Sequence, residues 1–258
     1  MPHAVVTGAA GGIGRAVAER FAHAGYRLTL SDLDGPALRR VAADVDALPM
    51  PADLTEDATP AVLVERAWES GGTIDVLVNA AGLYPSLDML DVTAENWDRL
   101  FALNLRAPVL ATAAYGRRVA EARTTGAVVN ISSGSALRSR PGGGPYATTK
   151  AALEMATRAA ALEFGVLGIR VNAVSPGFVP VASEANPVSP VYARAISANP
   201  LGRLGTPSDI AHTVHWLCTP EASWITGEVV RVDGGSSTGA LHLPRIDGRS
   251  GPGERNSA

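Results

Sequence analysis

The 258-residue chain contains a single cysteine, Cys218. One thiol cannot form an internal disulfide or a Cys-rich metal site, so the composition fits a reducing compartment and we expect a cytoplasmic protein. No stretch approaches the ~18 consecutive apolar residues that a membrane-spanning helix needs. The opening residues, MPHAVVTG, have neither a basic start nor a long apolar run, which argues against a secretory signal. These absences argue against a disulfide-stapled, secreted or membrane-spanning protein.

An excess of charge of one sign is also missing. Lys and Arg number 22 and Asp and Glu number 25, which gives a formal net charge of −3. A nucleic-acid-binding domain usually carries a basic excess or a basic stripe, so nucleic acid is not an expected partner. Apolar residues make up 46% of the chain, which is enough for a sizeable core and argues against general disorder. The length favours one large domain over two small ones.

Short apolar runs alternate along the chain with longer segments of helical periodicity. The predicted strands are His3–Thr7, Tyr26–Ser31, Ala47–Pro51, Ile74–Asn79, Ala127–Ser132, Ile169–Ser175 and Val229–Val232. The predicted helices are Gly14–Ala24, Ala37–Val45, Thr59–Glu69, Asp98–Arg123, Ala147–Phe164 and Ser208–Leu217. Several strands are apolar along most of their length, as expected when both faces are covered. The pattern predicts an α/β fold, a doubly wound parallel sheet of about seven strands with helices on both faces.

The alternating pattern occupies residues 1–238, which we interpret as one domain. Two segments depart from it. Residues 178–200 are rich in proline, which is typical of an irregular flap, and we predict a substrate lid there. Residues 239–258 are polar and rich in Gly and Arg, and we interpret them as a C-terminal tail.

A glycine-rich turn, Thr7-Gly8-Ala9-Ala10-Gly11-Gly12-Ile13-Gly14, follows the first predicted strand and opens the first helix. Because Gly8, Gly12 and Gly14 lack Cβ, a diphosphate can approach the backbone closely. The amides and dipole at the helix N-terminus then offset its negative charge. Glycines also make ordinary turns, but the strand–turn–helix context predicts a dinucleotide site.

Asp32 ends the second predicted strand. A carboxylate at this point accepts hydrogen bonds from both ribose hydroxyls of adenosine and repels a 2′-phosphate, so Asp32 favours NAD over NADP. The alternative interpretation is an aspartate that only caps a helix or a turn, and the two roles are compatible.

Tyr146 stands at the start of the helix predicted over Ala147–Phe164, and Lys150 follows four residues later. Positions i and i+4 share one helical face, which brings an ammonium near a phenol. A nearby cation stabilises the phenolate, and a tyrosine that acts as a general base near neutrality needs such a cation because its ordinary pKa is about 10. Tyr-x-x-x-Lys occurs by chance in many helices, but Ser133, 13 residues before Tyr146, adds a hydroxyl after a predicted strand.

These motifs, and the order in which they follow one another along the chain, resemble those of the classical type of the short-chain dehydrogenase/reductase family. The resemblance covers about residues 3–237 and includes Asn79-Ala80-Ala81-Gly82 and Val232-Asp233-Gly234-Gly235. It implies a single-domain Rossmann-like fold. One departure is Val181, which stands where family members often carry a threonine that binds the nicotinamide carboxamide.

The resemblance implies roles for individual residues. The implied catalytic residues are Asn104, Ser133, Tyr146 and Lys150. The implied cofactor-binding residues are Gly8, Gly12, Ile13, Gly14, Asp32, Leu33, Asp53, Leu54, Asn79, Ala80, Gly82, Tyr146, Lys150, Pro176, Gly177 and Val179. The implied substrate-binding residues are Ser133, Ser135, Arg140 and Tyr146. No metal is implied.

The implied function is NAD-dependent interconversion of a secondary alcohol and a ketone, with Tyr146 as general acid/base. One alternative is an NADPH-dependent ketoreductase similar to 3-oxoacyl-carrier-protein reductases, and another is a dinucleotide-binding regulatory protein without catalysis. The resemblance also implies a homotetramer or homodimer with Asp98–Arg123 and Ala147–Phe164 at one interface. Arg138 and Arg140 lie between Ser133 and Tyr146, either as solvated loop cations or with one of them reaching an anionic group of the substrate.

Overall fold

The computed structural model describes residues 1–33, 35–181, 188–239 and 246. Its strands are β1 (His3–Thr7), β2 (Arg27–Ser31), β3 (Leu48–Pro49), β4 (Val76–Asn79), β5 (Gly126–Ile131), β6 (Ile169–Pro176) and β7 (Val229–Val232). They form one seven-stranded sheet in the order 3-2-1-4-5-6-7, and every neighbouring pair is parallel. The predicted doubly wound parallel sheet is confirmed.

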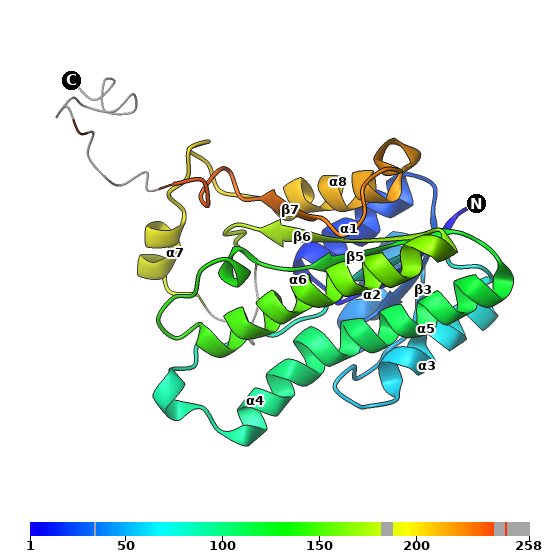
Figure 1. Ribbon diagram of the computed structural model, residues 1–258, viewed down its shortest axis with the longest axis horizontal. Helices are drawn as coiled ribbons and strands as arrows, with labels where there is room; N and C mark the ends of the chain where they lie inside the picture. The colour runs from blue at the N-terminus through cyan, green and yellow to red at the C-terminus, as the bar shows by residue number, and fades with distance from the viewer. Residues whose placement is uncertain (34, 182–187, 240–245, 247–258) are drawn as a thin grey trace.

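Helices cover both faces of this sheet (Figure 1). One layer consists of α1 (Gly12–His23), α2 (Gly35–Asp44) and α8 (Pro207–Cys218). The other layer consists of α3 (Thr59–Gly71), α5 (Ala107–Ala122) and α6 (Gly144–Phe164). Two further helices are α4 (Ala94–Phe101) and α7 (Pro190–Ile196), and Figure 1 shows α7 beyond the ends of β6 and β7. Short 3₁₀ turns occur at Met89–Asp91, Gly134–Ala136, Gly165–Leu167 and Pro220–Ala222.

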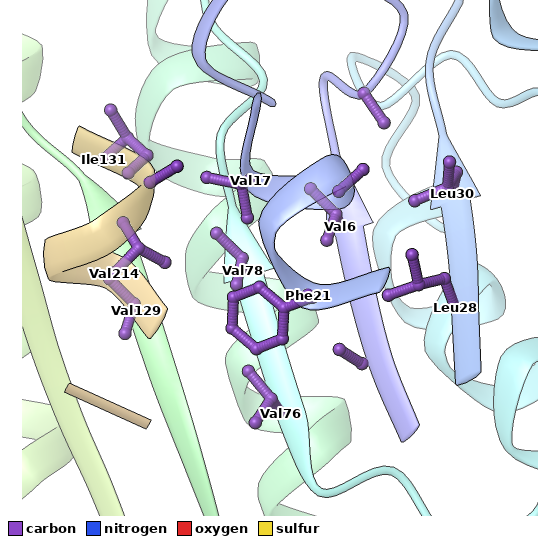
Figure 2. Close-up of a cluster of buried hydrophobic side chains, with 14 of the residues drawn as sticks. Val6, Val17, Phe21, Leu28, Leu30, Val76, Val78, Val129, Ile131 and Val214 are labelled. Atoms are coloured by element: carbon purple, nitrogen blue, oxygen red, sulfur yellow. The ribbon is translucent and has the colours of Figure 1, made fainter. Parts of the chain in front are cut away.

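Successive residues of the central strands point into two separate cores. In β1, Val6 packs in the core under α1 and α8, whereas Val5 packs in the core under α3 and α5. Figure 2 shows Phe21 of α1 packed over Val6 and Val78, and all three side chains are fully buried. Burial on both sides explains why these strands read as nearly continuous apolar runs.

The helix predicted over Asp98–Arg123 is interrupted in the structure. It begins earlier, as α4, where Thr93 accepts a hydrogen bond from the Asn96 amide at 3.3 Å. A π-helical turn over Ala102–Arg106 then precedes α5. The apolar spacing of this region fits a continuous helix equally well, so it did not reveal the wider turn.

Two other predicted elements also differ. The strand predicted over Ala47–Pro51 is reduced to β3 at the sheet edge. Pro49 and Pro51 alternate with Met50 and Ala52, whose amides still donate to the carbonyls of Leu30 and Asp32 at 2.8 and 3.0 Å, so the prolines take the positions that face away from β2. The predicted irregular lid contains α7. Residues 240–258 of the predicted tail, apart from Ile246, lie outside the described residues. No helix in the described ranges is both long and apolar enough to cross a membrane.

Candidate active site

A cavity of about 1580 Å³ opens at the carboxyl ends of the strands. Its lining includes Gly8 after β1, Asp32 after β2, Ala80 after β4, Ser132 after β5 and Gly177 after β6. The strand order reverses between β1 and β4, and open parallel sheets bind ligands in the crevice at such a switch point. The topology therefore places a ligand site where the glycine turn lies.

The glycine turn is held by backbone contacts too close for other residues. Gly8 has a φ of +68°, and a Cβ there would lie 2.7 Å from the Ala81 backbone. A Cβ on Gly14 would lie 2.0 Å from the carbonyl oxygen of Gly8. Gly12 has a φ of +54°, and the nearest neighbour of a Cβ there would be Val181, at 3.5 Å. The segment after Pro176-Gly177 therefore comes close to the glycine turn.

The first turn of α1 fits a dinucleotide diphosphate. Its N-cap, Gly11, supplies no side-chain hydrogen bond, and the first turn contains no acidic residue. A Cβ on Gly11 would meet nothing within 4 Å, so the space beside it is open. Free amides at a helix N-terminus bind anions, and the helix dipole adds to the attraction.

Asp32 is oriented by the backbone. Its Oδ2 accepts a hydrogen bond from the Ala10 amide at 2.9 Å, and its Oδ1 accepts one from the Leu33 amide at 2.7 Å. Each carboxylate oxygen has a second lone pair for a ribose hydroxyl. Leu33 is 68% exposed and offers no cation to a 2′-phosphate. The geometry therefore matches the ribose-binding role expected of Asp32.

Asp53 and Leu54 line the same cavity. The Oδ1 of Asp53 accepts hydrogen bonds from the Thr55 hydroxyl at 2.7 Å and the Thr55 amide at 2.9 Å. These bonds hold the pKa of Asp53 below its usual value, and the charge of Arg99 acts in the same direction. This end of the cavity offers a fixed carboxylate beside an apolar side chain.

Ser133 and Tyr146 meet in the same cavity. Burial raises the pKa of Tyr146 to about 12, although a hydrogen bond with Ser133 and the charge of Arg140 act to lower it. The Oγ of Ser133 also accepts a hydrogen bond from the Ser135 amide at 3.1 Å. The tyrosine is therefore protonated in the chain by itself at neutral pH.

Lys150 lies beneath the tyrosine. Its Nζ is 5.8 Å from the centroid of the Tyr146 ring and donates a hydrogen bond to the Ile131 carbonyl at 2.8 Å. The side chain is 4% exposed, and burial lowers the pKa of Lys150 to about 8. The predicted proximity of Lys150 to Tyr146 is therefore present.

Asn104 lies in the π-helical turn and is 1% exposed. Its Oδ1 accepts from the Leu83 amide at 2.8 Å, and its Nδ2 donates to the Leu83 carbonyl at 2.7 Å. A Cβ on Gly82 would lie 3.2 Å from Asn104 Oδ1 and 3.7 Å from Lys150 Nζ. The bare glycine therefore lets the amide and the ammonium approach each other.

The structure brings nearly all predicted site residues to one cavity. Those that line it are Gly8, Gly12, Ile13, Gly14, Asp32, Leu33, Asp53, Leu54, Ala80, Gly82, Ser133, Ser135, Arg140, Tyr146, Lys150, Pro176, Gly177 and Val179. Asn104 and Asn79 are not in the lining. Asn79 instead donates to Asn130 Oδ1 at 2.8 Å and to Thr112 Oγ1 at 3.3 Å, and so joins β4 to β5 and α5.

Comparisons with known proteins agree with this geometry. The family model described as enoyl-(acyl carrier protein) reductase matches residues 8–237. Sorbitol dehydrogenase from Cereibacter sphaeroides is 32% identical over 246 residues, covering 90% of this chain and 96% of the relative. The 3-oxoacyl-(acyl-carrier-protein) reductase of Thermotoga maritima is 32% identical over 236 residues, covering 90% of this chain and 96% of the relative. The structure of a blue fluorescent protein from a metagenomic library, solved in complex with NADPH, aligns with a TM-score of 0.83 at 31% identity. The alignment covers 92% of this chain and 98% of that protein.

The chain belongs to the short-chain dehydrogenase/reductase family. This membership confirms the resemblance that the motifs indicated. It makes the protein an oxidoreductase that acts on CH–OH groups with NAD(P).

The cavity of this short-chain dehydrogenase/reductase includes aromatic residues that the sequence analysis missed. The ring centroid of Tyr84 is 6.1 Å from that of Tyr146. Tyr192 comes from α7, and its ring centroid is 6.3 Å from that of Phe178. A signal for α7 was available, because Ser189 precedes a proline at the first helical position and accepts from the Tyr192 amide at 3.2 Å. Tyr84 has no comparable signal.

The two loop arginines have different surroundings. Arg138 is exposed and donates to the Ser236 carbonyl at 2.8 Å. Arg140 is half-buried, and its Cζ lies 4.6 Å from the ring centroid of Tyr192. The two arginines therefore contact different segments of the chain.

Proposed function

We propose that the protein is an NAD-dependent oxidoreductase that interconverts a secondary alcohol and its ketone, with Tyr146 as general acid/base. The observation that carries the proposal is that Ser133, Tyr146 and Lys150 line the same cavity as the glycine turn and Asp32. NAD, when bound, supplies the hydride acceptor for oxidation.

Each catalytic side chain has a distinct role in this proposal. The Oη of Tyr146 accepts the proton of the substrate hydroxyl during oxidation and returns it during reduction. The hydroxyl of Ser133 orients the substrate oxygen and stabilises the charge that develops on it. Lys150 donates one hydrogen to Ile131, which leaves two for the nicotinamide ribose and a water. Asn104 holds this water as part of a proton relay to solvent.

The protonation of Tyr146 gives the two directions different pH dependence. Because burial raises the pKa of Tyr146 to about 12, the phenol stays protonated between pH 6 and 8 and must lose its proton before it can accept one. We therefore expect alcohol oxidation to become faster as pH rises from 6 to 8, and ketone reduction to change little over the same range. Initial rates in both directions, measured with saturating cofactor, check this expectation.

The choice of NAD over NADP depends on Asp32. Its carboxylate lines the cavity, and neither Gly11 nor Leu33 supplies a cation beside it. An NADPH-dependent ketoreductase is the second candidate, favoured by the similarity to the Thermotoga reductase and to the NADPH-bound structure. We expect kcat/KM for NAD⁺ to exceed that for NADP⁺ at least about tenfold, because a ribose-binding carboxylate repels the 2′-phosphate. The reverse ratio would favour the second candidate.

A dehydrogenase screen with NAD⁺ over sugars, hydroxy acids, steroids and cyclic diols tests the reaction class. The matched variant is Tyr146→Phe, which removes only the phenolic oxygen. We expect kcat to fall by roughly 10²–10⁴-fold, while NADH binding, followed by fluorescence, stays unchanged. A wild-type protein that binds NADH and turns over no alcohol would instead be a dinucleotide-binding protein without catalysis.

We further propose a cytoplasmic homotetramer or homodimer with Asp98–Arg123 and α6 at one interface. Exposed apolar side chains on these helices support it, with Met155 62% and Leu162 83% exposed and Val109 39% exposed on α5. Exposed apolar side chains are typical of association sites where they gather into a patch. Light scattering measures the mass of the assembly in solution, and we expect Leu162→Glu to shift this mass toward that of the monomer.

A further inference from the structure

Arg140 is a cation that has no ion-pair partner among the described residues. Its side chain is half-buried and lines the cavity. A guanidinium taken partly out of water loses hydration energy, and a bound anion offsets this loss. Arg140 is therefore suited to bind an anionic group of a ligand.

The side chain is held in place from two directions. A Cβ on Gly143 would lie 2.9 Å from Arg140 Cγ, so the stem packs against this bare glycine. The guanidinium lies over the Tyr192 ring, with Cζ 4.6 Å from its centroid. A guanidinium on a ring uses its face for this contact and keeps its in-plane N–H donors available.

The loop that carries Arg140 is fixed as well. The Gly143 amide donates to the Arg140 carbonyl at 2.9 Å, and the Leu87 amide donates to the Gly142 carbonyl at 2.8 Å. The stem and the backbone of Arg140 are thus set before a ligand arrives, which lowers the entropy cost of binding.

Two other charged residues described near this end of the cavity, Arg138 and Asp233, have partners. Arg138 donates to the Ser236 carbonyl. The Asp233 carboxylate accepts from the Gly235 amide at 2.8 Å and the Ser237 amide at 3.0 Å. The charge of Arg140 acts on Tyr146, because it lowers the pKa of that phenol. A substrate that contacts Tyr146 is therefore within the electrostatic reach of Arg140.

We propose that Arg140 binds a carboxylate of the substrate, so that the enzyme acts on hydroxy acids and the matching oxo acids. The inference rests on the proposed alcohol–ketone chemistry at Tyr146. One guanidinium with a planar donor fork matches a planar monoanionic carboxylate through two parallel hydrogen bonds. The bound carboxylate would then lie between the loop before α6 and the lid helix α7.

The test compares 2-, 3- and 4-hydroxy acids with their methyl esters, which keep the shape and lose the charge. We expect Arg140→Ala to lower kcat/KM for the preferred acid by about 10- to 100-fold, mainly through KM, because one charge-assisted contact is lost. The kcat/KM for the ester should change by less than about twofold. Arg140→Lys keeps the charge and loses the planar donor fork, so its kcat/KM for the acid should lie between those of the wild type and Arg140→Ala.

Arg138→Ala is the matched control. It removes the same charge from the same loop, two residues away, and is expected to affect acid and ester equally. An equal loss for acid and ester in Arg140→Ala, or a wild type that oxidises esters and not acids, would overturn the inference. A phosphorylated secondary alcohol tested in parallel would overturn the carboxylate assignment if it were preferred over every hydroxy acid.

A binding measurement separates failure of this inference from failure of the proposed function. The NADH complex is titrated with the matching oxo acids and followed by NADH fluorescence, which needs no turnover. Binding at least tenfold weaker in Arg140→Ala, with Arg138→Ala unchanged, supports the carboxylate site even in a protein that catalyses nothing. Equal binding in all three proteins rejects the site even where alcohol oxidation is observed.

Discussion

The two ends of the cavity are built in different ways. At the dinucleotide end, the surface is mostly backbone, with close glycine contacts and Asp32 oriented by two amides. At the substrate end, the surface is made of side chains from separate segments, such as Ser133 after β5, Arg140 before α6 and Tyr192 on α7. The first end tolerates little change, whereas the second can change residue by residue. This difference is one way in which a single fold serves many substrates with one cofactor.

The largest expected effect tests the backbone-built end. Gly14→Ala places a Cβ 2.0 Å from the Gly8 carbonyl oxygen, and main-chain atoms cannot move aside cheaply. We expect the free energy of unfolding in urea to fall by about 3 kcal/mol or more, together with loss of NADH binding. Gly11→Ala is the control, because a Cβ there meets nothing within 4 Å. A Gly14→Ala protein as stable as Gly11→Ala would contradict the contrast between the two ends.

Asp32→Asn tests the side chain to which we assign the choice between NAD and NADP. The amide keeps the shape of the carboxylate and loses its charge, so repulsion of a 2′-phosphate disappears. We expect the ratio of kcat/KM for NAD⁺ to that for NADP⁺ to fall about 10- to 100-fold, or ~1.4–2.7 kcal/mol. Steady-state kinetics with both cofactors and one substrate measure this ratio. An unchanged ratio would mean that Asp32 serves only the turn.

Lys150→Met tests the buried cation where the two ends meet. Because the pKa of Lys150 is lowered from 10.5 to about 8, the folded chain binds this proton more weakly than the unfolded chain. The charged form therefore costs stability below pH 8, and the stability of the wild type rises with pH between about 8 and 10.5. We expect Lys150→Met to lose activity and to gain about 1–2 kcal/mol of unfolding free energy at pH 7.

The pH dependence provides the check on that variant. The free energy of unfolding is measured by chemical denaturation at pH 7 and at pH 10. The variant and the wild type should differ strongly in this free energy at pH 7 and only slightly at pH 10. A difference that does not change with pH would show that the buried ammonium carries no such cost.

The smallest effect concerns the side-chain-built end. Tyr192→Leu removes the ring beneath Arg140, a contact worth about 0.5–1 kcal/mol. We expect the KM of the organic substrate to rise about two- to fivefold, with the Kd of NADH unchanged. Tyr192→Phe keeps the ring and should resemble the wild type. A parallel change in NADH affinity would show that the two ends are not independent.

The same contrast decides what the sequence could predict. The glycine turn and Asp32 were found because a short motif and a strand end specify them locally. The sheet was found because its strands are buried on both faces, and β1 and β7 have the predicted bounds. Tyr84 and Tyr192 were missed, because their place at the cavity follows from tertiary packing of a loop and a short helix.

The surroundings of Asn104 also lay beyond the sequence pattern. The motif resemblance identified the residue, but its π-helical turn and its two bonds to Leu83 depend on how α4 and α5 join. Lys150 shows a different limit. Helical spacing predicted its nearness to Tyr146, whereas its low pKa follows from burial under Tyr146 and against Ile131, which spacing does not reveal.

The central position of β1 has a consequence for biosynthesis. This strand pairs with β2 on one side and with β4 on the other, so its second neighbour is complete only at residue 79. At translation rates of ~5–20 residues per second, the interval from residue 31 to residue 79 lasts about 2–10 s. During that time the growing chain carries an unpaired strand edge to which other chains can add. Pausing of the ribosome within this interval should therefore reduce the yield of folded enzyme.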